Sequence, residues 1–113
     1  MRISTLATAT GLTTKTIRYY EQSGLLPAPP RTAGGYRDYP PEAQPRLTFI
    51  RDAQAAGLTL AEIRGVLALR DSGQAPCPHT AALIEAHLRH IEERITALTR
   101  TQAALRQLTT QAP

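Results

Sequence analysis

The chain has 113 residues, a single cysteine, no tryptophan and a formal net charge of +4. This length suits one small domain, or a small domain with a long helix, and a lone cysteine excludes an internal disulfide framework. We expect a reducing compartment. The first residues, MRISTLATATGL, lack the apolar core of a signal peptide, and no apolar run approaches the ~18 residues of a membrane span. A cytoplasmic protein without a membrane partner is therefore expected.

The excess positive charge lies in the N-terminal half of the chain. Residues 1–51 carry seven cations and three acids, whereas residues 52–113 carry six of each. Charge placed in this way predicts a polyanionic partner for the N-terminal half alone.

The first 24 residues predict two short helices joined by a turn. Ser4 precedes apolar residues at helical spacing and is the expected N-cap of the first helix, which Gly11 breaks. Thr13 or Thr14 can cap the second helix, and Gly24 ends it. Helix, short turn and helix within about 20 residues is a helix-turn-helix pattern.

The second helix separates polar from apolar side chains. Ile17 and Tyr20 are expected to face inward. The expected exposed side consists of Thr14, Lys15, Arg18 and Tyr19. In the DNA major groove, Arg and Lys reach base edges or phosphates and Tyr hydroxyls anchor the backbone, so this helix is a candidate DNA reader.

A proline-rich stretch follows, with a Gly-Gly pair between its two proline clusters. Gly34-Gly35 lies at the centre of residues 31–39 and predicts a tight hairpin, because both glycines accept a positive φ. We expect this hairpin to act as a wing that adds backbone contacts, with Tyr39 packing within it. The wing residues expected to contact DNA are Arg31, Tyr36 and Arg37.

Two further helices are predicted after the wing. The first begins at Pro41-Glu42, tolerates Pro45 only in its first turn, and stops at Gly57. Thr59 caps the second, with Glu62 three residues later completing a capping box.

The last segment has no Gly or Pro until Pro113 and carries a narrow apolar seam. Its members are spaced alternately by four and three residues, with only Gln102 interrupting; they are Ile84, Leu88, Ile91, Ile95, Leu98 and Leu105. This heptad spacing is typical of a coiled coil, and homodimerisation is the expected way to cover the seam. The alternative is a single amphipathic helix folded back over the head.

A longer order of residues resembles the MerR family of bacterial transcription regulators across essentially residues 1–110. The residues that carry the likeness are Ile17-Arg18-Tyr19-Tyr20-Glu21, Gly24-Leu25, Arg31, Gly35-Tyr36-Arg37, Tyr39, Arg46-Leu47, Phe49-Ile50, Gly57 and Leu60. The resemblance implies a mainly α fold: a winged helix-turn-helix head with linking helices at residues 1–70, and a long antiparallel coiled-coil dimerisation helix at 77–110.

The resemblance also implies a function. A homodimer would bind a pseudo-palindromic promoter in double-stranded DNA and distort it so that RNA polymerase can engage both promoter elements, in the cytoplasm on the nucleoid. Lys15, Arg18, Tyr19, Tyr36 and Arg37 match positions that the family uses on DNA. Arg18 is the first choice for reading a base edge. The alternatives are an architectural or excisionase-like winged-helix DNA binder without effector sensing, and a small enzyme, for which no catalytic constellation appears.

The effector is open at this point. Heavy-metal sensors of the family place a Cys where Cys77 stands and complete the site with a loop after the helix, but this chain ends at QLTTQAP with no second Cys. No cofactor is certain. A thiophilic or divalent metal could bind through Cys77, His87 and His90 could share a metal on one helix face or merely border the seam, and Cys77 could have a redox role. We expect a regulator that lacks the usual sensing loop, because its signal differs or because residues after Pro113 are missing.

Overall fold

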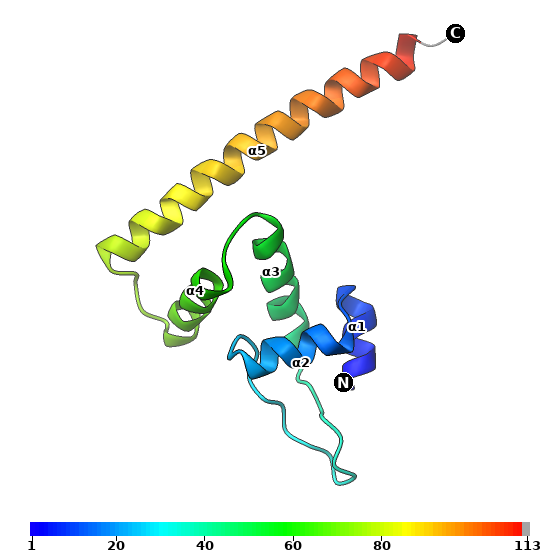
Figure 1. Ribbon diagram of the computed structural model, residues 1–113, viewed down its shortest axis with the longest axis vertical. Helices are drawn as coiled ribbons and strands as arrows, with labels where there is room; N and C mark the ends of the chain where they lie inside the picture. The colour runs from blue at the N-terminus through cyan, green and yellow to red at the C-terminus, as the bar shows by residue number, and fades with distance from the viewer. Residues whose placement is uncertain (112–113) are drawn as a thin grey trace. The chain divides into compact units, whose positions relative to one another are not determined.

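The computed structural model describes residues 1–111, and within them the chain forms five helices and no β-strand. Figure 1 shows the helices along the chain. They are α1 (Ile3–Thr10), α2 (Thr14–Gln22), α3 (Ala43–Ala55), α4 (Leu60–Ser72) and α5 (Pro78–Gln111). The chain divides into two compact units, Met1–Gly73 and a second that begins at Gln74. The mainly α fold expected from the sequence is confirmed.

The first two helices form the predicted helix-turn-helix, with one difference at the start. Arg2, and not Ser4, is the N-cap of α1, and it makes no side-chain capping bond. The Ser4 prediction was wrong because α1 begins at Ile3, two residues earlier than a Ser4 cap implies, and the Leu6 N–H donates to the Arg2 carbonyl at 3.1 Å. Gly11 ends α1 at a φ of 72°, and the Thr13 side chain caps α2 by accepting the Thr16 N–H.

The core of the first unit draws apolar side chains from all four of its helices. α1 packs on α2 and α3, and α3 packs on α4. The buried apolar residues are Leu6, Ile17, Tyr20, Leu25, Leu26, Tyr39, Ala43, Leu47, Ile50, Ala53, Ile63 and Leu67. Ile17 and Tyr20 face inward as predicted, whereas Tyr39 belongs to this core instead of packing within a hairpin.

Three arginines tie the end of the helix-turn-helix to α3 and α4. Arg46 donates from Nε to the Leu25 carbonyl at 2.7 Å, and Arg64 donates twice to the Ser23 carbonyl. Arg51 donates to the Thr10 carbonyl at the end of α1. The Thr10 and Ser23 carbonyls belong to the ends of α1 and α2, which leave them without helical partners, and the Leu25 carbonyl lies in the loop just beyond α2.

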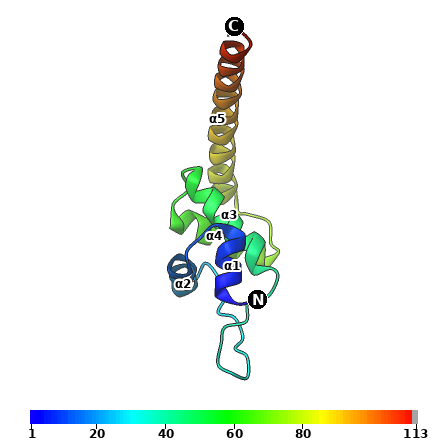
Figure 2. The ribbon, with the colours of Figure 1, turned by 90° about the vertical axis from the view of Figure 1, so that its right-hand side faces the viewer.

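The loop between α2 and α3 projects from the head in both views (Figures 1 and 2). Arg31 and Arg37 form an isolated antiparallel bridge, and the Thr32 N–H donates to the Tyr36 carbonyl at 2.7 Å. The turn differs from the predicted Gly-Gly pair, because only Gly35 has a positive φ, at 83°. The connection is therefore a three-residue loop with its left-handed position at Gly35. Gly34 instead leaves room for the Tyr36 ring, because a Cβ at this position would lie only 3.3 Å from that ring.

The linking helices follow their local signals. α3 begins at Ala43, two residues later than predicted, so Pro45 lies in the first turn, where its missing N–H costs nothing. Thr59 and Glu62 form the predicted reciprocal capping box at the start of α4.

The second unit contains α5, a helix of 34 residues with no buried residue. Such a helix is about 51 Å long at ~1.5 Å per residue. Within the described residues, no helix is both long and apolar enough to cross a membrane.

Candidate DNA-binding surface and dimerisation helix

The exposed side of α2 carries the cations predicted there. Lys15 and Arg18 are exposed, Thr14 is half-buried, and Tyr19 is 51% exposed with its ring 6.0 Å from that of Tyr20. Thr14 is thus the least accessible of the predicted residues on this helix.

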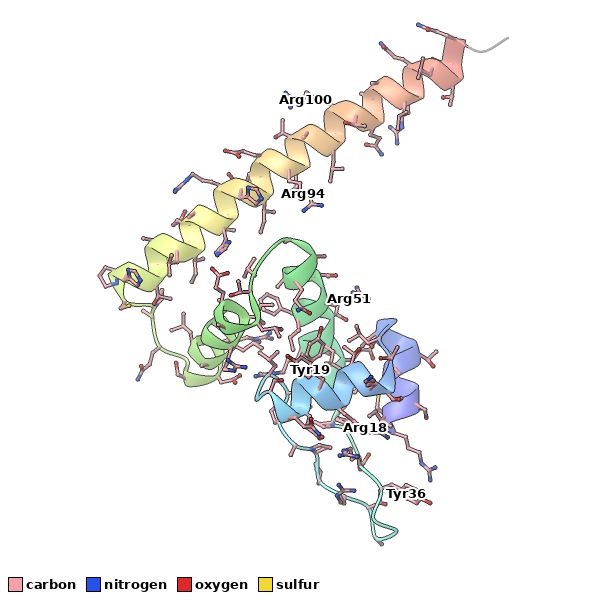
Figure 3. All side chains as sticks on the ribbon, viewed as in Figure 1. Arg18, Tyr19, Tyr36, Arg51, Arg94 and Arg100 are labelled. Atoms are coloured by element: carbon pink, nitrogen blue, oxygen red, sulfur yellow. The ribbon has the colours of Figure 1, made fainter. Side chains whose placement is uncertain are left out.

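A hollow of about 260 Å³ gathers side chains from three separate segments of the head. It is lined by Arg2, Ile3, Ser4, Arg18, Arg31, Gly35, Tyr36 and Arg37. Figure 3 shows Arg18 on the side of α2 that faces the loop, with Tyr36 farther out on the loop. Four arginines around one concave surface make a strongly positive site for a polyanion.

Arg37 is held in this surface by an acid of α2. Its Nε lies 3.2 Å from Glu21 Oε2, and both side chains are largely shielded, at 28% and 11% exposure. Burial, and next the negative charge of Glu21, raise the pKa of Tyr39 below this pair. The Tyr39 hydroxyl and Glu21 Oε1 are both buried, and neither has a hydrogen-bond partner of good geometry. Glu21 lies close enough to Tyr39 to raise the pKa of its hydroxyl, mainly through its charge and more weakly through hydrogen bonding.

Arg31 and Tyr36 are each oriented by a neighbour. Arg31 donates from Nη1 to the Gly35 carbonyl at 2.8 Å, which pulls its guanidinium toward the tip of the loop. The Arg2 guanidinium lies 4.7 Å from the centre of the Tyr36 ring, a cation–π contact that joins the start of the chain to the loop. Tyr36 remains 57% exposed.

Arg2 is the residue of this surface that sequence reasoning missed. Its charge was counted within the basic N-terminal half, but the pattern offered no sign that the start of α1 meets the loop. Conversely, two cations of the same half, Arg46 and Arg51, make structural bonds to the carbonyls of Leu25 and Thr10. The charge excess therefore predicted where the basic region lies, but not which of its cations line the hollow.

The six seam residues all lie on α5, and none of them is buried. Ile84 and Ile91 are half-buried. The others are exposed, at 44% for Leu88, 57% for Ile95, 62% for Leu98 and 58% for Leu105. A continuous apolar strip of this size on a helix is unusual unless another surface covers it.

Cys77 lies just before α5 and is an exposed free thiol. Its sulfur is 3.2 Å from the Thr80 hydroxyl and accepts the Thr80 N–H at 3.5 Å. These hydrogen bonds, the side-chain one first, lower the pKa of the Cys77 thiol below its ordinary 9.0. Among the described residues of one chain, no three His, Cys, Asp or Glu side chains gather closely enough to hold a metal ion. Cys77 and the histidines thus do not gather into a three-ligand group within the described residues of a single copy.

A helix-turn-helix followed by a basic loop, with two linking helices and a long helix that carries an apolar seam, is the architecture of a winged helix-turn-helix transcription regulator. The family of MerR HTH regulatory proteins matches residues 1–69, and the family described as MerR, DNA binding, matches residues 45–108. The chain belongs to the MerR family of transcription regulators, and the resemblance seen in the sequence is confirmed. The family's members are regulators and not enzymes, so neither the enzyme nor the excisionase-like alternative is favoured.

Individual relatives agree over nearly the whole chain. The HTH-type transcriptional regulator ZntR homolog of Haemophilus influenzae is 36% identical over 108 residues, which are 96% of this chain and 80% of the relative. The crystal structure of the regulator PbrR691 from Ralstonia metallidurans CH34 in complex with lead(II) matches with a TM-score of 0.68 and 35% identity, over 100% of this chain and 88% of that chain. The fold also matches HiNmlR, a MerR family regulator lacking the sensor domain and bound to promoter DNA, with a TM-score of 0.74 and 21% identity, over 91% and 78% of the two chains.

Proposed function

We propose that two copies of this chain bind a pseudo-palindromic promoter, each placing α2 in a major groove and the 31–37 loop on the adjacent backbone. The observation that carries the proposal is the hollow in which Arg2, Arg18, Arg31 and Arg37 converge with Tyr36. Phosphate neutralisation by such a cluster supplies sequence-independent affinity, and a helix beside it supplies the readout.

The side chains divide into two roles by their settings. Arg18 projects from α2, so its planar guanidinium can meet a guanine edge with two hydrogen bonds. Lys15 and Tyr19 on α2, and Tyr36 on the loop, suit the backbone, as do Arg31 and Arg37, whose guanidiniums are fixed by Gly35 and Glu21. The half-buried Thr14 suits a backbone contact near the start of α2.

Dimerisation through α5 completes the regulator. A second copy covering the exposed seam would hold two heads at a set distance, as the two-fold symmetry of promoter half-sites requires. A rigid pair of heads can bend and untwist the promoter, and the deformation energy then contributes to specificity and to the access of RNA polymerase. We expect a regulator of this kind to act in the cytoplasm, on the nucleoid.

A thiophilic or divalent metal ion is the effector class that the relatives favour, since PbrR691 was solved with lead(II). Cys77 is the candidate ligand here, and further ligands would have to come from outside the described residues of one copy. Titrating reduced protein with zinc, copper(I) and mercury(II) while following thiolate absorption tests this. Stoichiometric uptake that Cys77→Ser abolishes would support it, and the absence of uptake would contradict it.

The DNA-binding proposal is tested with duplexes selected from a random library by the full chain, followed by fluorescence anisotropy at several salt concentrations. Arg18→Ala should cost about 1–3 kcal/mol and relax discrimination at one base step, whereas Tyr36→Phe should weaken binding to all duplexes alike. Arg100→Ala is the matched control, because it removes the same charge from exposed α5 (Figure 3). Equal losses for Arg18→Ala and Arg100→Ala would refute the assigned surface.

A further inference from the structure

An acidic side chain lies behind one of the cations of the DNA-binding surface. The hollow of about 260 Å³ that gathers the arginines is lined by Arg37 and not by Glu21. A second hollow, of about 170 Å³, is lined by Glu21 together with Arg31 and Arg37, which also line the first. The Arg37 guanidinium therefore stands between the Glu21 carboxylate and the surface that a polyanion would approach.

Glu21 holds Arg37 by one edge of its guanidinium. Nε of Arg37 donates to Oε2 of Glu21 at 3.2 Å, and within residues 1–111 this is the only hydrogen bond of the Arg37 side chain. The two amino groups, Nη1 and Nη2, are thus left to bind a ligand. Arg31 differs, because its Nη1 already donates to the Gly35 carbonyl. A planar guanidinium fixed through Nε presents its amino groups as a fork, which matches the oxygens of a phosphate.

The contact also orders a long side chain before DNA arrives. An arginine that loses its rotamer freedom on binding lowers the affinity by the cost of that ordering, and a side chain already fixed avoids the cost. Water screens the Arg37–Glu21 pair less than an ordinary surface pair, since the two side chains are only 28% and 11% exposed. The pair can therefore keep Arg37 in one orientation.

Tyr39 places a hydroxyl beside the same carboxylate. Its ring is buried in the core of the head, and among the described residues neither the hydroxyl nor Oε1 of Glu21 has an aligned partner. Burial, and next the charge of Glu21, raise the pKa of Tyr39, so the hydroxyl keeps its proton. A buried donor and a nearby buried acceptor are satisfied by one small movement, in which Tyr39 donates to Oε1.

We propose that Glu21 and Tyr39 are positioning residues for DNA binding: Glu21 fixes Arg37 for a backbone phosphate, and the Tyr39 hydroxyl holds Glu21. The inference rests on the proposed function, and it adds an acid that strengthens binding to a polyanion. A carboxylate that withheld Arg37 from DNA would occupy its amino groups, whereas the bond in the structure is to Nε.

The effect of one substitution in two backgrounds tests the role of Glu21. Fluorescence anisotropy with the duplexes selected by the full chain compares the native chain, Glu21→Gln, Arg37→Ala and the double variant. Glu21→Gln should lower the affinity of the native chain about 3- to 10-fold, because Arg37 must then be ordered on binding. In the Arg37→Ala chain it should raise the affinity about 2-fold, because it removes an acid that has lost its cation. Arg37→Ala alone should reduce the slope of log affinity against log salt by about 1.

Glu42→Gln is the matched control, because it removes the same charge from an exposed position just before α3. It should weaken binding in neither background. A gain of affinity for Glu21→Gln in the native chain would overturn the proposal, since a withheld arginine or simple repulsion predicts that result. Equal losses in both backgrounds would overturn it too, because they would reflect stability alone. If the native chain selected no duplex, the proposed function itself would fail.

Tyr39→Phe tests the support of Glu21, because it removes the hydroxyl and keeps the ring in the core. It should lower the affinity about 2-fold in the native chain and have no further effect in the Glu21→Gln chain. The same loss in both chains would show that Tyr39 does not act through Glu21 and would overturn its role. Circular dichroism at the temperature of the binding assay confirms that each variant is folded.

Discussion

Arg46 on α3 bonds both to the Leu25 carbonyl and to the Asp71 carboxylate. Substitutions at Arg46 and at Asp71 therefore distinguish the contribution of a shielded contact from that of an exposed one. Nε donates to the Leu25 carbonyl at 2.7 Å, and Nη1 and Nη2 lie 2.9 and 3.1 Å from the two oxygens of Asp71. The Arg46 side chain is 16% exposed, Leu25 is fully buried, and the Asp71 side chain is 53% exposed. The two contacts of one guanidinium therefore lie in very different surroundings.

The buried bond should dominate the effect on stability. Arg46→Ala leaves a buried carbonyl without its charged donor, at a cost of about 1.5–3 kcal/mol. The ion pair with exposed Asp71 contributes much less, because water screens it. Asp71→Asn should accordingly destabilise far less than Arg46→Ala, although it removes the ionic partner.

Urea unfolding followed by circular dichroism at 222 nm measures both variants, at one fixed protein concentration because dimer formation would contribute to stability. Arg46→Lys is the conservative control, since it keeps the charge but loses the planar fork. The reasoning would be refuted by an Asp71→Asn loss as large as that of Arg46→Ala, because the exposed pair would then be the stabilising contact.

Other substitutions test local features of the fold. Gly65→Ala should raise the unfolding free energy by about 0.5–1 kcal/mol, since open space surrounds this position in the middle of α4. Gly24→Ala should lower the unfolding free energy by about 1 kcal/mol, because φ is +78° there. A stabilising Gly24→Ala with a destabilising Gly65→Ala would contradict the backbone conformations of the two glycines. Thr80→Ala should return the pKa of Cys77 toward 9.0 and slow its alkylation by iodoacetamide at pH 7, and Thr80→Ser should not; equal rates in all three proteins would exclude the hydrogen bond as the cause. The hydrogen bond with Arg46 lowers the pKa of Asp71 below its ordinary 3.8. The stabilisation from this pair is therefore complete above pH 3.8 and is lost as the pH falls through the folded-state pKa. A difference in unfolding free energy between the native chain and Asp71→Asn that persists in strong acid would argue against this linkage.

The sequence by itself was sufficient for most features that depend on residues close together in the chain, with the Ser4 cap and the Gly34-Gly35 turn as exceptions. Gly11, Thr13 and the Thr59–Glu62 capping box end or begin their helices as predicted, because caps and left-handed glycines act within one helical turn. The same holds for the inward side of α2 at Ile17, which follows from a period of 3.6 residues. The family likeness also lies in this short-range order of residue types.

Only the tertiary structure decided which partners distant residues find. Arg2 meets Tyr36, Arg37 meets Glu21, and Arg46 serves a carbonyl 21 residues earlier, none of which a local pattern encodes. Tyr39 enters the core, where burial of its ring outweighs the packing expected within the loop. An arginine in a sequence is simply a cation, and whether it binds a carbonyl of the protein or remains available to DNA depends on how the folded chain surrounds it.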